Sequence, residues 1–232
     1  MSRVSFIGMT TPSAYTGCNT AEDLVAYAAR VSNPGNQNNT ETASKLLRYL
    51  IKHAHWSPFE MVSITMEIVT TRDISRQILR HRSFSFQEFS QRYAKSSHFL
   101  GREARLQDPK NRQNSIELDL GDYGKGGEAQ DSTHQTRLAE TWHIKQHEVI
   151  NKSRDVYEWA LANGIAKEQA RAVLPEGNTE TTLYMAGTLR SWIHYCELRR
   201  ENGTQKEHMV IADKCWSIIA QHFPSVVEAL DG

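Results

Sequence analysis

Apolar and polar residues alternate along residues 61–70, and this period of two predicts a strand with one buried face. The apolar positions are Val62, Ile64, Met66 and Ile68. Residues 3–9 (RVSFIGM) and 179–189 (TETTLYMAGTL) are also predicted to be strands. The candidate strands lie far apart in the sequence, so any sheet that they form brings distant segments together.

Other segments repeat with the period of a helix. Thr20 and Asp23 form the sequence of a capping box, which predicts a helix that runs through residue 32. A long helical pattern extends from Glu128 to Asn163, and Gly164 suits its end. Further helices are predicted over residues 40–53, 72–81, 166–175, 190–200 and 206–223. Because helices and strands do not alternate regularly, their order favours an α+β architecture over a doubly wound parallel sheet.

Two polar segments interrupt these patterns. Residues 33–40 (NPGNQNNT) have the Asn and Gly content of a turn region. Residues 101–127 are polar and rich in glycine, and we expect them to form a long surface insertion that is mobile at its GKGG end.

The most unusual stretch is RHRSFSFQEFSQRY, residues 80–93, which mixes cationic side chains with aromatic rings. Its first half follows a predicted helix whose polar residues share one stripe, while Ile74 and Ile78 lie on another face. The stripe consists of Asp73, Arg76, Gln77, Arg80 and His81. A solvated helix face is the simplest explanation of this stripe, but the residues that follow it point elsewhere.

Residues 84–93 allow two conformations. In an extended chain, Glu88, Ser90 and Arg92 project to one side. In a helix, Glu88 and Arg92 form an ordinary i,i+4 ion pair beside an apolar stripe of Phe86, Phe89 and Tyr93. The serines and the scarcity of Ala and Leu favour an extended or looped segment.

The cations of this stretch point in different directions, because neighbouring helical residues diverge by about 100°. Arg80, His81 and Arg82 therefore suit two anionic ligands better than one. Guanidinium groups match phosphate oxygens in a bidentate manner, and nearby rings can stack on flat heterocycles.

Composition narrows the classes of function. Lys plus Arg is 27 and Asp plus Glu is 27, so the formal net charge is zero, which argues against a general nucleic-acid binder. No apolar run is long enough for a bilayer and no signal-peptide core is present, so we expect a cytoplasmic protein with no membrane partner. The histidines and three cysteines show no metal-ligand spacing, so we predict no metal site.

The sequence resembles a known protein family. Arg80-His81-Arg82, seven residues and then Ser90 resemble the signature of the flavin-dependent thymidylate synthases. The resemblance runs from about residue 20 to about residue 225, although Gln87 stands where the family commonly has asparagine and the 101–127 insertion has no clear equivalent. The matching features are Gln77, Ser85, Glu88, Arg92, Tyr93, HAHWSPFE (53–60), AKEQARAVLP (166–175) and TLRSWIHYCELR (188–199).

The resemblance implies one domain over residues 1–232, with an antiparallel-type sheet and helices, in a homotetramer whose active sites form between subunits. It implies reductive methylation of dUMP to dTMP, in which methylenetetrahydrofolate gives the carbon, FAD carries the hydride and NADPH reduces the flavin. Cys18, Cys196 and Cys215 lack an activated setting, so we expect electrostatic activation of uracil C5. The alternative is a nucleotide-binding or single-stranded nucleic-acid-binding protein without catalysis, because basic residues between aromatics can serve that function.

The resemblance also assigns roles to residues, with Arg199 as the catalytic arginine at the uracil. The dUMP positions are Gln77, Ile78, Leu79, Arg80, Glu88, Phe89, Ser90, Gln91, Arg92, Arg171 and Arg199. The FAD positions are Ser57, Arg80, His81, Arg82, Glu88, Thr188, Arg190 and His194. His55 and Tyr93 match the folate and nicotinamide side.

Arg190 and Arg199 lie nine positions apart on one predicted helix. At about 100° per residue, they occupy opposite faces and do not easily serve one pocket of one subunit. This geometry suits a homotetramer with shared sites.

Overall fold

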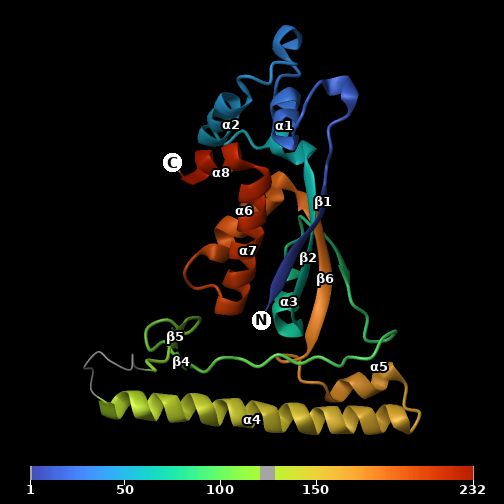
Figure 1. Ribbon diagram of the computed structural model, residues 1–232, viewed down its shortest axis with the longest axis vertical. Coiled ribbons are helices and arrows are strands. Elements are labelled where there is room, and N and C mark those ends of the chain that lie inside the picture. Colours follow the sequence, from blue (N-terminus) through green and yellow to red (C-terminus); the bar gives the residue numbers. More distant parts are fainter. Residues whose placement is uncertain (1, 121–128, 232) are drawn as a thin grey trace.

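A four-stranded antiparallel sheet forms the centre of the computed structural model, which describes residues 2–120 and 129–231 (Figure 1). Each neighbouring pair of strands is antiparallel. The sheet and the surrounding helices confirm the α+β prediction. In their order across the sheet, the strands are β1 (Arg3–Met9), β2 (Ser63–Thr71), β6 (Glu180–Thr188) and β3 (Ser85–Glu88).

The central strand β2 has the predicted buried face, since Ile64, Met66 and Ile68 are buried in the main core. The next residues, Val69 to Thr71, are buried on both faces. Two long helices, α6 (Leu189–Arg200) and α7 (Lys206–His222), cover one face of the sheet (Figure 1). The indole of Trp192 on α6 donates to the carbonyl of Ile64 over 3.1 Å, which ties this helix to β2.

Four elements close the upper end of the sheet in Figure 1. The capping box before α1 is confirmed, because Asp23 N donates to Thr20 Oγ1 and Thr20 N donates to Asp23 Oδ2. The last of these helices, α8, was not predicted. The elements are α1 (Ala21–Ala29), α2 (Ala43–Lys52), the 3₁₀ helix η3 (Ser57–Met61) and α8 (Pro224–Asp231).

The lower end is crossed by the long helix α4 (Ala129–Ala162). The chain leaves it at Gly164, whose φ of 77° is the left-handed conformation that glycine adopts most easily. The predicted helix over residues 166–175 divides into α5 (Lys167–Ala170) and the 3₁₀ helix η4 (Arg171–Val173). Ala170 packs with α4 in a small second core.

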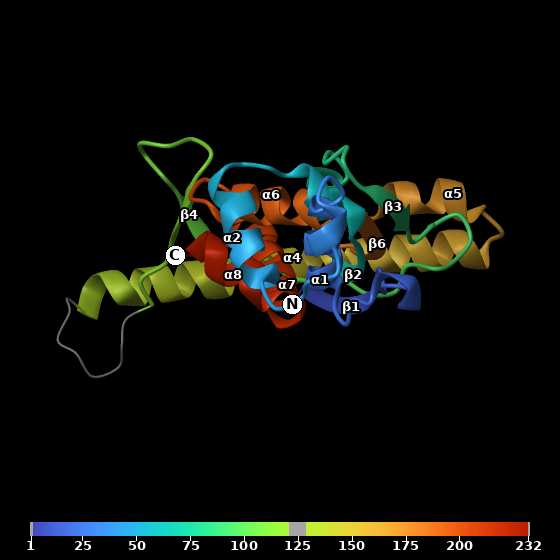
Figure 2. The ribbon, with the colours of Figure 1, turned by 90° about the horizontal axis from the view of Figure 1, so that it is seen from above.

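The insertion is more ordered than a loop. Its strands β4 (Arg105–Gln107) and β5 (Ser115–Glu117) form a two-stranded hairpin that was not predicted. Figure 2 shows this hairpin and the first half of α4 projecting from one side of the body. The GKGG end, residues 124–127, lies outside the described residues.

The remaining elements are short. The 3₁₀ helices η1 (Ala14–Thr16) and η2 (Pro34–Asn36) lie in connecting segments, and η2 falls in the predicted turn region. The helix α3 (Arg72–Ile78) ends three residues before its predicted end. No helix within residues 2–120 and 129–231 is long and apolar enough to span a membrane.

Candidate active site

Phe84 anchors the unusual stretch to the core. Its ring lies over Gly187 of β6, where an added Cβ would come within 2.4 Å of the Phe84 ring. The same ring packs edge-on against Trp192, with 4.9 Å between ring centroids. Arg80 and Arg82 remain exposed, and their side chains have no partner within the part of the chain that the structure describes. This arrangement explains why the stretch mixes aromatic and cationic residues. Phe84 is buried and fixes the segment to the core, while Arg80 and Arg82 face the solvent.

The extended or looped conformation favoured over a helix for residues 84–93 is confirmed, because the chain is extended in β3 and looped after it. After Glu88 the chain turns, and Tyr93 N donates to the Ser90 carbonyl over 3.1 Å. A fully extended chain would place Glu88, Ser90 and Arg92 on one side, and that arrangement does not form. Glu88 bonds with α3, whereas Arg92 reaches Glu168 of α5, with 3.1 Å between Arg92 Nε and Glu168 Oε2.

The Glu88 carboxylate is held from several sides. Its Oε1 accepts from Ser75 Oγ at 2.9 Å and from Thr181 Oγ1 at 3.1 Å. Its Oε2 accepts from Arg76 Nη1 at 3.2 Å. Burial lowers the pKa of nearby Arg72, although the charge of Glu88 opposes that shift. A carboxylate can accept about four hydrogen bonds, so Oε2 keeps capacity for a ligand.

Arg199 and His81 form the centre of one group of predicted residues. Arg199 Nε donates to His81 Nε2 over 2.9 Å, and the Tyr195 ring lies edge-on to the imidazole at 4.9 Å. Burial, and then the charge of Arg199, lower the pKa of His81 to about 4, so the imidazole is neutral at pH 7. The terminal nitrogens of Arg199 have no hydrogen-bond partner among the described residues and are open to solvent. They can donate to an anionic or carbonyl oxygen.

Gln77 belongs to the same group, and it contacts two residues that sequence reasoning missed. Its Oε1 lies 3.3 Å from His208 Nδ1, and its Nε2 donates to Gln205 Oε1 over 2.7 Å. A signal for His208 was present, because it shares an apolar helical stripe with Ile211 and Cys215. A histidine within such a stripe needs a buried polar partner.

A second group surrounds α5. Arg92 and Arg171 both contact Glu168, the latter by an Nε hydrogen bond of 3.3 Å to the backbone carbonyl. Lys167 Nζ donates to the Tyr93 carbonyl over 3.1 Å, while the Tyr93 side chain is 86% exposed. The Arg92–Glu168 ion pair is largely exposed, so Arg92 can leave Glu168 and pair with a ligand anion at little cost in free energy.

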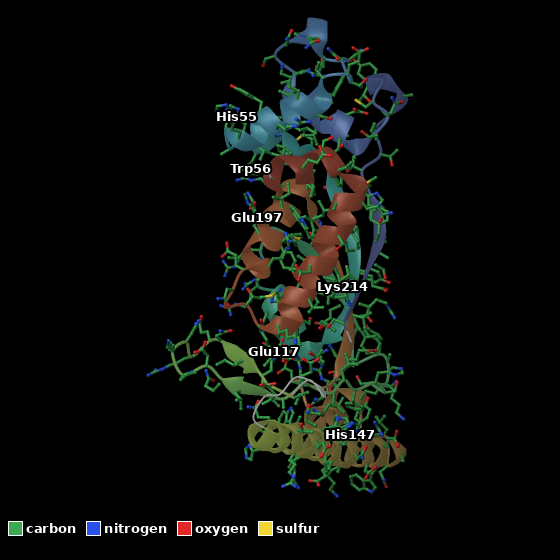
Figure 3. The ribbon with its side chains drawn as sticks, turned by 60° about the vertical axis from the view of Figure 1, so that its left-hand side comes forward. His55, Trp56, Glu117, His147, Glu197 and Lys214 are labelled. Carbon is green, nitrogen blue, oxygen red and sulfur yellow. The ribbon has the colours of Figure 1, made fainter. Side chains whose placement is uncertain are left out.

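A third group lies where η3 meets the start of α6. Arg190 forms an ion pair with Glu60, and His194 packs edge-on against Trp56 at 5.0 Å. Thr188 caps α6 by accepting from Ser191 N at 3.3 Å. Figure 3 shows that His55 and Trp56 lie at the upper end of the molecule, far from the hairpin that carries Glu117. The remaining member, Ser57, is exposed at the start of η3.

Four further predicted dUMP positions lie beside these groups. The Ile78 side chain is 0% exposed in the main core, and Leu79 packs partly against that core. Gln91 is 5% exposed and donates to Ser96 Oγ over 3.0 Å. Phe89 pairs its backbone N–H with Thr182. Ile78 and Gln91 therefore have only backbone groups to offer a ligand.

The three groups remain separate within one chain. Across residues 2–120 and 129–231, no hydrogen bond, ion pair or ring contact joins the named members of different groups. Arg190 and Arg199 meet different partners, at opposite ends of α6. In the same described residues, no cluster of three or more His, Cys, Asp or Glu side chains could hold a metal ion.

The thiols near these groups are not activated. Cys196 and Cys215 are 0% exposed, and burial raises the pKa of both thiols. A thiol that stays protonated and buried is a poor nucleophile.

Comparison with known proteins identifies the family. A family model described as thymidylate synthase complementing protein matches residues 14–225. A probable flavin-dependent thymidylate synthase from Paramecium bursaria Chlorella virus 1 is 51% identical over 216 residues, which cover 93% of this chain and 93% of the relative. The flavin-dependent thymidylate synthase of Synechocystis sp. is 47% identical over 230 residues, covering 98% and 99%.

Solved structures agree with this match. The UMP/dUMP methylase PolB from Streptomyces cacaoi, bound with 5-Br dUMP, aligns with a TM-score of 0.76 and 25% identity, covering 100% of this chain and 95% of that one. The chain belongs to the thymidylate synthase complementing protein family, and it is an enzyme. The alternative of a binding protein without catalysis is therefore wrong.

Proposed function

We propose that this enzyme methylates dUMP to dTMP and depends on a flavin. The observation that carries the proposal is the 51% identity, over 93% of both chains, to a probable flavin-dependent thymidylate synthase. The finer assignment is that methylenetetrahydrofolate donates the carbon, FAD carries the hydride and NADPH reduces the flavin. The geometry of the three groups supports this division of tasks.

Arg199 stabilises the charge that builds up on the uracil when C5 reacts. Its terminal nitrogens are free among the described residues, and its Nε is fixed by His81. Because the His81 imidazole is neutral, it accepts this hydrogen bond and does not repel the guanidinium. Charged donors that are already oriented toward developing negative charge are among the strongest catalytic devices.

The nucleotide phosphate is an anion that arginines can grip. Arg92 and Arg171 both contact Glu168, and Ser90 Oγ accepts from Arg92 N at 3.4 Å. The exposed ion pair between Arg92 and Glu168 can exchange for a phosphate. Glu88, fixed by Ser75 and Thr181, keeps an acceptor position for a ligand hydroxyl. Gln77, Arg80 and the backbone of residues 78, 79, 89 and 91 complete the proposed dUMP contacts.

The residues present fit FAD, a diphosphate with a flat ring. Arg80 and Arg82 are exposed and have no protein partner in the described part of the chain, so they can pair with phosphates. When bound, FAD supplies the hydride that converts the transferred methylene carbon into a methyl group. His55 and Tyr93 are assigned to the folate and nicotinamide side. The other proposed FAD contacts are Ser57, His81, Glu88, Thr188, Arg190 and His194.

We propose a homotetramer in which subunits share active sites. The separation of the three groups within one chain supports this assembly. The surface of α4 supports it too, since Trp142 is 43% exposed, Val149 is 54% exposed and Trp159 is 61% exposed. These apolar side chains are spread along α4, and another subunit would remove them from water.

A turnover assay tests the function. Purified protein is incubated with dUMP, methylenetetrahydrofolate and NADPH, with and without FAD, and the nucleotide and folate products are separated by chromatography. We expect dTMP only when flavin is present. Because the hydride comes from the flavin, the folate product should be tetrahydrofolate. Formation of dihydrofolate, or equal dTMP in flavin-free protein, would contradict the proposal.

A further inference from the structure

A chain of side-chain hydrogen bonds runs through Gln77. Gln77 Nε2 donates to Gln205 Oε1 over 2.7 Å, and Gln205 Nε2 donates to Glu207 Oε2 over 2.9 Å. On the other side of the amide, His208 Nδ1 lies 3.3 Å from Gln77 Oε1, and Tyr195 Oη lies 3.0 Å from His208 Nε2. The chain thus connects the core beneath α6 with the beginning of α7.

The direction of each hydrogen bond is fixed by its neighbours. Glu207 accepts only, so Gln205 presents its Nε2 to the carboxylate and its Oε1 to Gln77. The Gln77 oxygen therefore faces His208, which must donate from Nδ1 and accept from the Tyr195 hydroxyl at Nε2. His208 is 0% exposed, and its pKa is lowered to about 3 by burial, then by the charge of Arg199, and last by the neighbouring His81. It stays neutral, as this tautomer requires.

The Nε2 and Oε1 of Gln77 each take part in one hydrogen bond, and each can form one more. An amide group has two N–H donors and two acceptor lone pairs. One N–H and one lone pair of Gln77 remain available, in a single orientation. The arrangement therefore presents an oriented donor and acceptor toward a ligand.

At its far end, at Glu207, this series of hydrogen bonds contacts the insertion. Arg105 of β4 forms an ion pair with Glu207 Oε1, and Arg102 Nη1 lies 3.1 Å from Glu207 Oε2. Arg102 is itself held by Asp73, with 2.6 Å between Nη2 and Oδ1. The Arg105 side chain is only 10% exposed. Arg105 thus holds Oε1 and Arg102 lies beside Oε2, so the carboxylate is fixed with Oε2 in a position to accept from Gln205.

We propose that Arg102 and Arg105 of the insertion orient the amide of Gln77 through Glu207 and Gln205, and thereby set the affinity of the enzyme for dUMP. This inference rests on the proposed function, in which Gln77 contacts dUMP. The proposal gives the hairpin a role, because β4 holds Arg105 against the Glu207 carboxylate, at which this series of hydrogen bonds ends. Arg102, Arg105, Glu207 and Gln205 act as positioning residues.

The central test is Gln205→Leu. The Gln205 side chain lines a cavity of about 710 Å³, and it makes no capping hydrogen bond with α7, so the leucine can be accommodated without disturbing the helix. We expect the Kd for dUMP, measured by titration of the FAD-loaded enzyme, to rise about 5-fold to 10-fold, as for the loss of one neutral hydrogen bond. The Kd for FAD and the thermal midpoint should not change.

Arg105→Ala should weaken dUMP binding in the same direction. Arg112→Ala is the matched control, because Arg112 is an exposed arginine in the turn of the same hairpin, outside the chain of hydrogen bonds. It should leave the Kd for dUMP unchanged. If Arg105→Ala fails to fold because it uncovers the Glu207 charge, Gln205→Leu still decides the question.

Gln205→Leu in a Gln77→Ala background distinguishes an effect on the orientation of Gln77 from a general loss of order in the site. If Gln205 acts through Gln77, Gln205→Leu has no further effect on dUMP affinity in that background. An equal effect in both backgrounds, or an unchanged Kd in the single variant, would overturn the inference and leave the proposed function intact. If Gln77→Ala itself binds dUMP normally, the assignment of Gln77 to the substrate fails, and the inference fails with it.

Discussion

Arg199 donates from Nε to His81 Nε2 over 2.9 Å, which joins the end of α6 to the loop after α3. The hydrogen bond requires an imidazole that is unprotonated at Nε2, and the pKa of His81, lowered to about 4 by burial and by Arg199, satisfies this requirement. The guanidinium plane is thereby fixed while its terminal nitrogens stay available. The geometry leads directly to a prediction for Arg199.

Arg199→Ala should retain FAD and lose dTMP formation. Removing one charged donor from a site where negative charge develops typically costs about 10²-fold to 10³-fold in rate. Arg199→Lys should recover only part of the loss, because an ammonium keeps the charge without the planar fork. The measurement is dTMP formation at saturating FAD. Arg200→Ala is the control, because Arg200 pairs with Asp213 and packs over Trp216 and has no contact with His81 among the described residues.

Arg190→Ala should give the reverse pattern. Arg190 lies at the start of α6, where it pairs with Glu60, and it is assigned to the flavin. We expect FAD affinity to fall about 10-fold, the effect of losing a charge-assisted hydrogen bond. If Arg199→Ala turns over normally while Arg190→Ala binds flavin as tightly as the parent, both assignments are wrong.

The lowered pKa values of His81 and His208 predict a loss of stability in acid. The pKa values of His81 and His208 are lowered to about 4 and about 3, mainly by burial. In the unfolded chain, a histidine has a pKa of about 6.5. The unfolded chain therefore binds more protons below pH 6.5. The stability from keeping both groups neutral is complete above about pH 6.5, and it is lost as the pH falls toward 4 and 3.

Urea unfolding between pH 6.5 and pH 5 measures this loss. Each histidine contributes a slope of up to about 1.4 kcal/mol per pH unit. His208→Gln, which can still accept from Tyr195 and donate to Gln77, should remove one such contribution. Parallel slopes in parent and variant would show that His208 does not titrate in this way.

Gly187→Ala should destabilise the fold. Its Cβ would meet Phe84 Cδ1 at 2.4 Å, and the ring cannot move freely, because it packs against Trp192 and Tyr195. Overpacking of this kind costs about 1–3 kcal/mol in the free energy of unfolding. Gly8→Ala is the matched control, because an added Cβ at that strand position has no atom within 4 Å. Equal unfolding midpoints for the two variants would contradict this account of Phe84.

The thiols should be dispensable. Cys196 and Cys215 are fully buried with raised pKa values, and Cys18 lies outside all three groups. Iodoacetamide added to the native protein should modify Cys18 alone, as seen by intact mass, and leave dTMP formation unchanged. Loss of turnover upon modification of a single thiol would point to a covalent mechanism.

Local patterns predicted the elements whose stability is local. The capping box at Thr20, the buried face of β2 and the end of α4 at Gly164 all follow from residues close in sequence. The hairpin β4–β5 does not, because its short polar strands are held by a distant residue, Glu207. The helix α8 was missed even though Pro224 at its first position is a recognised start signal.

The sequence supplied candidate residues for the site but not their geometry. The Arg-His-Arg motif gave Arg80 and His81 as candidates, and the segment at residues 188–199 gave Arg199. The hydrogen bond between His81 and Arg199 nevertheless spans more than one hundred residues and depends on packing. An extended chain would place Glu88 on the same side as Ser90 and Arg92, but the hydroxyl of Ser75 and the charge of Arg76 draw Glu88 to α3. Alternation along a strand cannot anticipate a competing partner on another element.

The most direct test of the central claim is a single turnover without NADPH. The FAD-loaded enzyme is reduced chemically under anaerobic conditions, mixed with dUMP and methylenetetrahydrofolate, and quenched, and dTMP is counted per flavin. We predict up to one dTMP per reduced flavin, and none when the flavin is left oxidised. No dTMP from the reduced enzyme, or the same yield from oxidised or flavin-free protein, would contradict the proposed function.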